Sequence, residues 1–231
     1  HQQHYQLLWN QLLSKALTMN VALHYTKGEG YYEQYKNDYG YDDETLAEYG
    51  ITTDWTVQGT LVNQKKMDND FYGAVASLNF DNSQGLQATV GGGWNKYVGD
   101  HFGLVKWSQP VATTYPNNEY YRNTGKKTDM NVYGKVDWEF LSGLSAYVDL
   151  QFRHLNYKMD GPTDEWNSDH TQKVFNFNDN YNFFNPKFGI NYQITPNHRV
   201  YASYAIAHKE PTRNDYEDNF GIGLKAERLN D

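Results

Sequence analysis

TDMNVYGKVDWEFLSGLSAYVDLQFRHLNYK, residues 128–158, holds two long runs in which apolar and polar side chains alternate strictly. The apolar positions are Val132, Gly134, Val136, Trp138 and Phe140 in the first run and Leu144, Ala146, Val148, Leu150 and Phe152 in the second. A period of two places these side chains on one face of a β-strand. Each run fits the roughly nine to eleven residues of a tilted membrane strand and exceeds an ordinary strand. The stretch therefore predicts a transmembrane β-hairpin with its turn at Ser142-Gly143.

The aromatic residues of this hairpin favour lipid as the surroundings of its apolar face. A soluble β-sandwich shows the same alternation, so the alternation alone leaves that fold open. Membrane strands carry aromatic rings near the ends of the apolar column, at the level of the lipid headgroups. Trp138 and Phe140 lie at the turn end of their column.

The composition argues against several classes of protein. The chain of 231 residues has no cysteine, a net charge of -8 and a mean hydropathy of -0.87. It holds no run of about 18 apolar residues, as a helical membrane span requires, whereas a β-barrel tolerates low hydropathy because half of each strand is polar. The acidic balance argues against nucleic-acid binding, which needs clustered Lys and Arg. No signal sequence opens the chain, so we expect residue 1 to lie within a longer protein.

Similar alternation recurs along the chain and predicts about eight strands with part of a ninth. The other runs are residues 4–9, 17–26, 71–80, 86–95, 187–194 and 200–206. Tight turns at DNSQG, residues 81–85, and at Pro196-Asn197 join two pairs of them. LKAERLND, residues 224–231, looks like the approach to a further strand. The expected fold class is all-β, an antiparallel transmembrane β-barrel segment.

Long polar stretches at residues 27–69, 98–127 and 159–180 separate these pairs, and we expect them to be loops. In outer-membrane barrels the short turns are periplasmic and the long loops are extracellular. Residues 56–66, TVQGTLVNQKK, are also strand-like. A membrane crossing there would put the loop at 98–127 on the periplasmic side. We therefore expect 27–69 to lie wholly outside the membrane, with 56–66 as a strand within that loop.

The polar stretches hold the aromatic residues that we expect to contact a ligand. Flat amphipathic rings suit a sugar or a metal chelate. The candidates are Tyr31, Tyr32, Tyr35, Tyr39, Tyr41, Tyr115, Tyr120, Tyr121 and Trp166. The alternative is that these rings only pack within the loops and the aromatic girdle that such barrels carry.

The polar faces of the strands carry many charges, which we expect to face a lumen. They are Lys135, Asp137, Glu139, Asp149, Arg153, Lys187 and Arg199. Charges at this density must be solvated or paired. That suits a wide barrel holding water or a polar plug, and a small barrel with an internal core of ion pairs stays open.

No motif points to catalysis or to a metal ion. DGPTDEWNSDH, residues 160–170, gathers carboxylates and a histidine but lacks the spacing and central glycine of a calcium loop. Asp100-His101 and His208 are isolated. No HExxH sequence or nucleophile elbow occurs. We expect no enzymatic activity, no metal site and no cofactor.

Seven strings are distinctive as a set, and they run over essentially the whole chain. They are HYQLLWN, NVALHYTKGEGYYEQYK, MDNDFYG, GGGWNKYVGDHFGLVKW, FNPKFGINY, YASYAIAHKEPTRNDY and LKAERLND. Together they resemble the barrel of TonB-dependent outer-membrane receptors of the Bacteroidetes type. Residues 1–231 would then be the central-to-C-terminal part of that barrel. The chain departs from the family pattern by lacking the plug domain, the TonB box and the C-terminal aromatic strand, and by having Ala226 where a proline is expected.

The resemblance implies a 22-stranded barrel with an N-terminal plug in the bacterial outer membrane. Such a receptor imports a scarce ligand, for example a siderophore, haem, cobalamin or a glycan, with energy passed on by TonB. The implied partners are the TonB complex acting through the plug, the small-molecule or glycan ligand, outer-membrane lipid and a surface lipoprotein, and no nucleic acid.

The resemblance also places YAIAHKEPTRNDY at the outer end of a strand and the loop after it. His208, Glu210, Arg213 and Asp215 would bond to neighbouring loop backbone and shape the mouth of the barrel. Two alternatives from the residues stay open. One is a small closed outer-membrane barrel with a structural or adhesive role, and the other is a soluble carbohydrate-binding β-sandwich.

Overall fold

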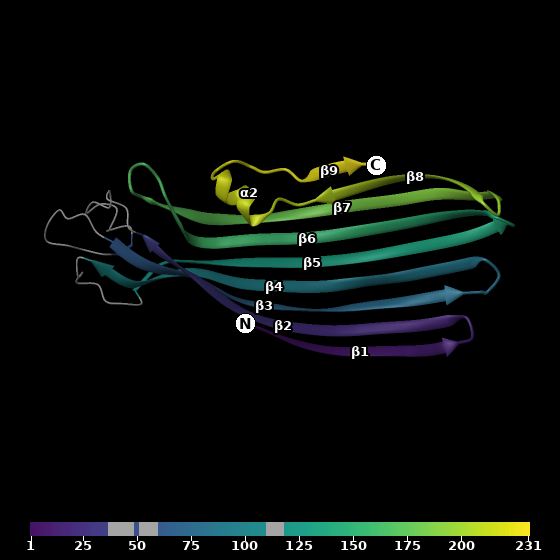
Figure 1. Cartoon of the computed structure of the whole chain (residues 1–231), viewed down its shortest axis with the longest axis horizontal. Helices are drawn as coiled ribbons and strands as arrows, with labels where there is room; N and C mark the ends of the chain where they lie inside the picture. The colour runs from purple at the N-terminus through teal and green to yellow at the C-terminus, as the bar shows by residue number, and fades with distance from the viewer. Residues whose placement is uncertain (37–48, 51–59, 110–117) are drawn as a thin grey trace.

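The computed structural model describes residues 1–36, 49–50, 60–109 and 118–231, whose nine strands form an antiparallel sheet. The strands are β1 (Gln2–Ser14), β2 (Leu17–Lys36), β3 (Thr60–Asp81), β4 (Leu86–Gln109), β5 (Asn118–Leu141), β6 (Leu144–Trp166), β7 (Gln172–Thr195), β8 (His198–Lys209) and β9 (Glu227–Asn230). They follow one another in chain order (Figure 1). The prediction of an all-β antiparallel barrel segment, with about eight strands and part of a ninth, is confirmed.

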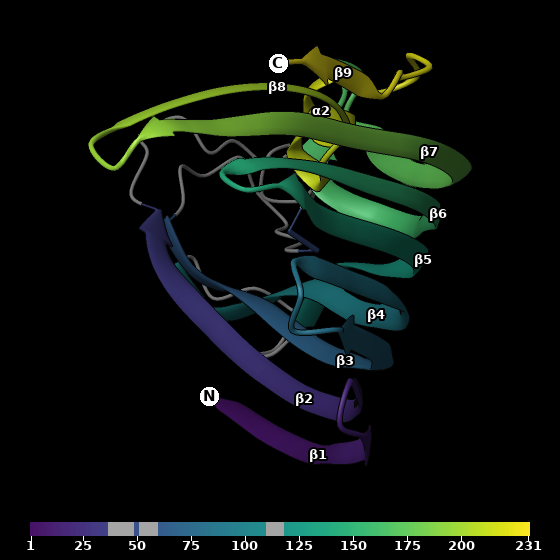
Figure 2. The same ribbon diagram turned by 90° about the vertical axis from the view of Figure 1, so that its right-hand side faces the viewer.

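The sheet bends into an open arc, and the short helix α2 (Arg213–Asp218) lies on its concave side (Figure 2). Residues that lie directly opposite one another on β5, β6 and β7 form an apolar row and a charged row. Val132, Phe152 and Phe184 lie directly opposite one another. Lys135, Asp149 and Lys187 form a second row of facing residues. Because the two rows differ by an odd number of residues, they lie on opposite faces.

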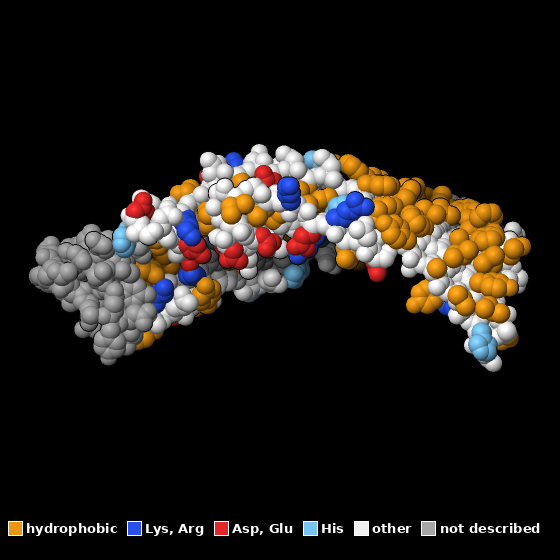
Figure 3. All heavy atoms as spheres, turned by 90° about the horizontal axis from the view of Figure 1, so that it is seen from above, with side chains coloured by type: hydrophobic (Ala, Val, Ile, Leu, Met, Phe, Trp, Pro, Cys, Tyr) orange, Lys and Arg blue, Asp and Glu red, His pale blue; other side chains and the backbone are white. Residues whose placement is uncertain are grey.

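The convex face is an apolar belt near the turn end of the strands. Leu7 is 65% exposed and Trp138 is 54% exposed. Apolar side chains gather over this half of the molecule, while charged ones gather over the other half (Figure 3). A contiguous exposed apolar surface of this extent marks contact with lipid or another apolar partner.

The two alternative folds do not match the arrangement of the described strands. A β-sandwich buries its apolar columns against a second sheet, but the strands described for residues 1–36, 60–109 and 118–231 follow one another in a single nine-stranded order. Within the same residues β1 pairs with β2 and β9 with β8, and no pairing joins β1 to β9 as a small closed barrel would need. No helix in the described part of the chain is long and apolar enough to span a membrane.

The tight turns lie where the sequence predicts them. Leu141 pairs with Leu144 across Ser142-Gly143, and Thr195 pairs with His198 across Pro196-Asn197. Gly143 has a φ of 76°, in the left-handed region that a hairpin turn of two residues requires. These turns connect the strands at the end where the apolar belt lies.

The prediction that the polar stretches are loops is wrong for most of the residues that the structure describes in them. Residues 27–36 pair with 61–70, 98–105 pair with 118–126, and 159–162 pair with 174–177. Each stretch continues a strand beyond the belt, toward what we call the outer end. There the strands lie outside the lipid, so the ladder of backbone hydrogen bonds persists without the strict apolar alternation that lipid imposes on the belt.

Residues 60–66 are the outer part of β3 and not a separate strand within a loop. They lie beyond the belt, because Tyr72 is the last large residue of the apolar column on this strand. Their placement outside the belt agrees with the expectation, whereas their continuity with residues 71–80 corrects it. Residues 56–59 lie outside the described residues.

Candidate functional site

A cavity of about 540 Å³ lies at the outer end of the sheet, beyond the belt. Its volume lies within the range of roughly 300–1,000 Å³ typical of small-molecule sites. It is lined by Gly30, Tyr31, Tyr32, Lys65, Lys66, Met67, His101, Tyr121, Asp164, Glu165, Arg213 and Glu217. These residues come from β2, β3, β4, β5, β6 and α2. The cavity therefore joins parts of the chain that are up to 187 residues apart, from Gly30 to Glu217.

A bulge in β5 brings Tyr121 to this cavity. The register with β4 shifts between Gly103 and Leu104, so that Tyr121 pairs with Gly103 while Glu119 pairs with Leu104. Tyr120 is the extra residue. A β-bulge of this kind changes the direction of side chains, and Tyr120 and Tyr121 both lie over Gly103 as a result.

Gly103 is needed at this bulge, and substituting it tests the placement of the two tyrosines. A Cβ atom at position 103 would lie 2.4 Å from ring carbons of both Tyr120 and Tyr121, and both rings are buried. We expect Gly103→Ala to destabilise the outer end by about 1–3 kcal/mol, since overpacking forces rings off their rotamers. Urea unfolding of the protein in detergent, followed by tyrosine fluorescence, measures the change.

Gly125→Ala is the matched control for that substitution. Gly125 lies on the neighbouring strand β5, and its added Cβ would meet only Met159 Cγ at 3.8 Å and Gly99 O at 3.9 Å. Those are ordinary contacts, so the control should unfold close to the wild type. Equal stability of the Gly103→Ala and Gly125→Ala variants would contradict the packing described for the bulge.

The charges around the cavity are largely paired. Lys65 binds Asp164, Arg213 Nε donates to Glu217 Oε1 at 2.8 Å, and Lys173 Nζ donates to Glu165 Oε2 at 2.8 Å. Burial raises the pKa of Glu217, which its contact with Arg213 opposes. The cavity thus offers tyrosine rings and hydrogen-bonding groups to a ligand, and ion pairs hold its walls together.

His101 adds no charge to the cavity at neutral pH. Burial, aided by the nearby Arg213 cation, lowers the pKa of His101 to about 4. A neutral imidazole has one donor and one acceptor nitrogen for a ligand.

The segment Glu210–Leu224, here called the inner segment, forms one wall of the cavity. Its helix α2 begins at Thr212 with a capping box, in which Asp215 N donates to Thr212 Oγ1 at 3.4 Å and Thr212 N donates to Asp215 Oδ2 at 2.6 Å. Six residues cannot stabilise a helix alone. The helix therefore depends on contacts with the concave face of the sheet.

Tyr216 anchors the inner segment by its ring and its hydroxyl group. The ring stacks on Phe177, with centroids 3.8 Å apart and planes at 10°, and meets the ring of Tyr157 edge-on. The hydroxyl donates to Asp179 Oδ2 at 2.6 Å and lies 2.8 Å from the Tyr181 hydroxyl. Tyr216 is consequently buried in a cluster with Leu155, Met159 and Phe175 of β6 and β7.

Glu210 anchors the start of the inner segment through charge. Its carboxylate accepts from Arg153 Nη1 at 2.9 Å and from Lys127 Nζ, and Arg153 Nε also donates to Asp129 at 2.8 Å. Burial opposes ionisation of Glu210, but these cationic donors outweigh it and lower its pKa to about 2. Glu210 is therefore an anion over the physiological pH range.

The expectation that residues 208–215 bond to neighbouring loop backbone is corrected by these contacts. Glu210 pairs with side chains of the wall. His208 Nδ1 lies 2.9 Å from Asn185 Oδ1, and its ring stacks on Phe183. Arg213 pairs with Glu217, while Asp215 alone binds backbone, at the helix cap of its own segment.

The predicted ligand-contacting residues divide into four groups. Tyr31, Tyr32 and Tyr121 line the cavity. Tyr120 is buried against Tyr49 and accepts from Asn63 Nδ2 at 2.9 Å, so its ring takes part in packing. Tyr35 and Trp166 lie on β2 and β6 but do not line the cavity. Tyr39, Tyr41 and Tyr115 lie outside the described residues.

The predicted polar column shares the face opposite the apolar belt. Besides the row of Lys135, Asp149 and Lys187, Lys135 Nζ lies 2.8 Å from Asp137 Oδ2. At the turn end Glu139 Oε1 accepts from Gly143 N at 3.0 Å, and Arg199 lies opposite Gln193. Arg153 alone of this set contacts the inner segment. Sequence reasoning missed Lys65 as a residue of the cavity, and it named His101 only as an isolated histidine and Arg213 only as a residue that binds loop backbone. All three have polar neighbours and carry no spacing signal.

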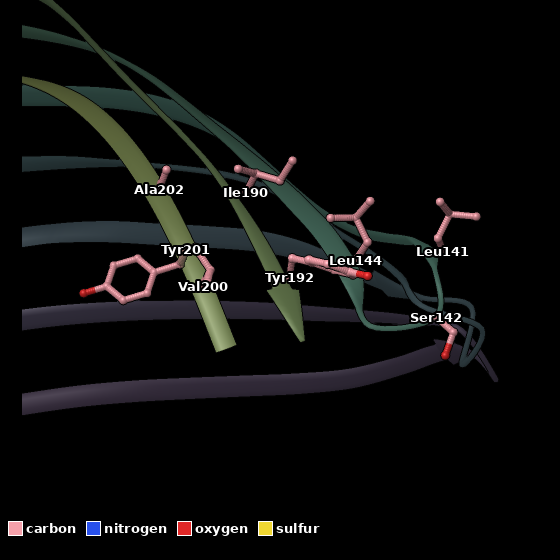
Figure 4. Close-up of a pocket in the computed structure, with 8 residues that line it drawn as sticks. All are labelled: Leu141, Ser142, Leu144, Ile190, Tyr192, Val200, Tyr201 and Ala202. Atoms are coloured by element: carbon pink, nitrogen blue, oxygen red, sulfur yellow. The ribbon is translucent and has the colours of Figure 1, made fainter. Parts of the chain in front are cut away.

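A second hollow, of about 460 Å³, lies near the turn end (Figure 4). Its lining is mainly aliphatic and aromatic, formed by Leu141, Ser142, Leu144, Ile190, Tyr192, Val200, Tyr201 and Ala202. Leu144, Ile190 and Val200 belong to the apolar belt, so this hollow is a lipid-facing groove and does not suit a polar ligand. Among the described residues no group of three or more His, Asp or Glu side chains is placed to hold a metal ion.

Two solved structures have a fold similar to that of this chain. The open form of the ferric-catecholate import receptor Fiu from E. coli K12 superposes with a TM-score of 0.65 at 13% identity, over 91% of this chain and 36% of that one. The siderophore receptor PiuA from Acinetobacter baumannii superposes with a TM-score of 0.62 at 15% identity, over 90% of this chain and 32% of that one. The chain thus spans about a third of the length of these receptors, and the likeness shows the fold.

The sequence comparison identifies the family. No curated protein sequence matches the chain significantly. Residues 2–230, nearly the whole chain, match the family model described as TonB dependent receptor-like, beta-barrel. The chain therefore belongs to the TonB-dependent receptor β-barrel family, whose members are bacterial outer-membrane proteins.

Proposed function

We propose that the protein to which this barrel belongs is an active importer of ferric siderophores. In this proposal the chelate binds in the outer cavity, crosses along the concave face, and draws its energy from the TonB complex through a plug domain. The receptor makes or breaks no covalent bond of the ligand. Bacteroidetes origin and a surface lipoprotein partner belong to the same proposal.

The single observation that carries the proposal is the outer cavity with Tyr31, Tyr32 and Tyr121 in its lining. Aromatic rings supply large contact areas with little loss of conformational entropy, and their hydroxyl groups can donate hydrogen bonds. Lys65, Lys66 and Arg213 add donors that suit the oxygen atoms of an anionic chelate. Of the two structurally similar receptors, one is named for ferric-catecholate import and the other for siderophores, which supports this class over haem, cobalamin or a glycan.

The outer cavity can be tested by removing one ring that lines it. We expect Tyr32→Ala in the intact protein to lower the affinity for its ferric siderophore about tenfold, because an aromatic contact contributes on the order of 1 kcal/mol beyond its buried area. Iron-55 uptake by cells that depend on this receptor, with catecholate and hydroxamate siderophores as probes, measures the loss.

Tyr35→Ala is the matched control. Tyr35 lies on the same strand as Tyr32, is 63% exposed and does not line the cavity, so its removal should leave uptake unchanged. Uptake that depends on the receptor for haem, cobalamin or a glycan, and not for any siderophore, would overturn the ligand class. Equal uptake by the Tyr32→Ala and Tyr35→Ala variants would overturn the site.

A further inference from the structure

Three lysines form a cluster on the convex face just beyond the apolar belt. Lys96 lies on β4, Lys126 on β5 and Lys158 on β6. Lys126 pairs directly with Lys158, and Lys96 pairs with Thr128, the next residue of β5 on the same face as Lys126. Lys96 follows Trp94 of the belt by two residues, about 7 Å along the strand. The cluster therefore begins where the lipid headgroups of the membrane would lie.

The lysine cluster has no compensating carboxylate within the described residues. None of the three ammonium groups forms an ion pair there, whereas Lys27, Lys65 and Lys127 each do. Like charges directly opposite on neighbouring strands destabilise a sheet. Lys126 and Lys158 are both exposed, so a bound anion can reach them from the membrane side.

The groups around the cluster also favour an anion. The row that holds Lys96 continues through Thr128, Asn156 and Asn180, and Asn156 Nδ2 donates to Asn180 Oδ1 at 3.0 Å. These neutral groups can donate to phosphate or sugar oxygens. The nearest carboxylates are Asp70, which lies opposite Val98 in the row of Lys126, and Asp100 and Asp160, which pair with Thr124 one row farther from the belt. Asp70 is already bound by the Tyr25 hydroxyl group and by Lys27. Asp100 is already bound by Arg122 at 3.0 Å.

An apolar hollow of about 630 Å³ lies nearer the turn end on β2, β3, β4 and β5, and two of these strands, β4 and β5, also carry lysines of the cluster. Ala74 and Ala76 of β3 and Gly92 of β4 form its floor, and Val132 of β5 and Met19 of β2 stand beside them. Gly92 precedes Trp94 and Lys96 on one face of β4. A single amphipathic molecule could therefore place its hydrocarbon chain in this hollow and its anionic head group at the lysines.

We propose that Lys96, Lys126 and Lys158 bind the phosphate head group of an outer-leaflet lipid whose acyl chain lies in the hollow. Charge complementarity selects phosphate, because ammonium groups form short, strong hydrogen bonds with its oxygens. The position at the edge of the belt and the apolar hollow select a lipid over a soluble anion. This site is on the convex face, and it is separate from the outer cavity.

Native mass spectrometry of the intact protein in detergent tests the lipid site. The probes are dioleoyl phosphatidic acid and, as a zwitterionic comparison, dioleoyl phosphatidylcholine. We expect phosphatidic acid to bind at least tenfold more tightly, and we expect the triple variant Lys96→Gln, Lys126→Gln and Lys158→Gln to lose that preference. The control variant Lys15→Gln, Lys209→Gln and Lys225→Gln removes the same number of charges elsewhere and should keep it.

Two further measurements distinguish binding of the whole lipid from binding of its phosphate group alone. Ala76→Leu fills part of the hollow without changing the charge, and we expect it to weaken phosphatidic acid binding several-fold. Inorganic phosphate at millimolar concentration should not displace the lipid. Equal binding of both lipids, equal loss in the two triple variants, or full displacement by inorganic phosphate would each overturn the proposal.

Discussion

Replacing Arg153 with methionine is expected to release the start of the inner segment from the concave face. Arg153 connects Asp129 of β5 to Glu210, and its removal leaves Asp129 without an ionic partner among the described residues. Losing one member of a buried ion pair costs about 3 kcal/mol, since the remaining charge stays desolvated. The side chains of Arg153, Asp129 and Glu210 are 22%, 21% and 9% exposed, so solvent screens this network only slightly.

Hydrogen exchange of the backbone amides in residues 210–224 measures this release. We expect those amides in Arg153→Met to lose protection, while the amides of β5 and β6 keep theirs, because the ladder between these strands does not use the guanidinium group. Lys127 still contacts Glu210 in the variant, which limits the effect to part of the segment. Arg153→Lys should be intermediate, since an ammonium group cannot reproduce the fork that meets two carboxylates.

Lys135→Met is the matched control for Arg153→Met. Lys135 belongs to the same charged column and pairs with Asp137, but both side chains are more than 40% exposed. An ion pair of this kind contributes less than about 1 kcal/mol. The control should leave exchange in 210–224 as in the wild type, and an equal loss of protection in both variants would show that Arg153 has no specific role.

The sequence predicted the belt well because lipid imposes a simple rule on it. In the hairpin of 128–158 every second side chain meets lipid, so the alternation survives in the sequence, and the turn at Ser142-Gly143 follows from the glycine. Beyond the belt no such rule acts. Residues 27–36 pair with β3 without interruption, and residues 98–105 pair with β5 on both sides of the bulge, yet nothing in the polarity of either stretch distinguishes it from a loop.

The sequence could predict only part of the outer cavity, because the cavity depends on the strand register and on side-chain pairs that are far apart in the sequence. Tyr32 and Tyr121 could be singled out as exposed-looking aromatic residues, but the bulge that turns Tyr120 into the packing arises from a register shift between β4 and β5. The pairing of Arg153 with Glu210 spans 57 residues and carries no local signal. The helix did leave a signal, because Thr212 followed by Asp215 is a capping box.

Replacing Tyr216 with alanine is expected to detach helix α2 from the concave face. The change removes the stack on Phe177 and the edge contact with Tyr157, and it leaves a cavity beside Phe175. Truncation of a buried aromatic side chain to alanine costs about 3–5 kcal/mol. A helix of six residues has no stability of its own to offset that loss, so amides 213–218 should exchange at nearly the rate of an unfolded chain.

Tyr216→Phe separates the contribution of the ring from that of the hydroxyl group. The phenylalanine keeps the stack but leaves Asp179 Oδ2 without the hydrogen bond at 2.6 Å. A hydrogen bond to a charged group contributes about 1.5–3 kcal/mol, so protection should fall less than in Tyr216→Ala. If the two variants exchange equally, the ring does not hold the helix, and the packing described for the inner segment is wrong.

Detachment of α2 should also change the outer cavity, because the helix places Arg213 and Glu217 in the cavity wall. Tyr216 itself does not line the cavity, so Tyr216→Ala can affect a ligand there only through the position of the helix. We therefore expect Tyr216→Ala to weaken siderophore binding while Tyr216→Phe retains most of it. Binding that follows exchange protection across these variants and Arg153→Met would mean that the docked inner segment is a structural part of the site. Binding that stays constant while protection falls would restrict the site to the strands.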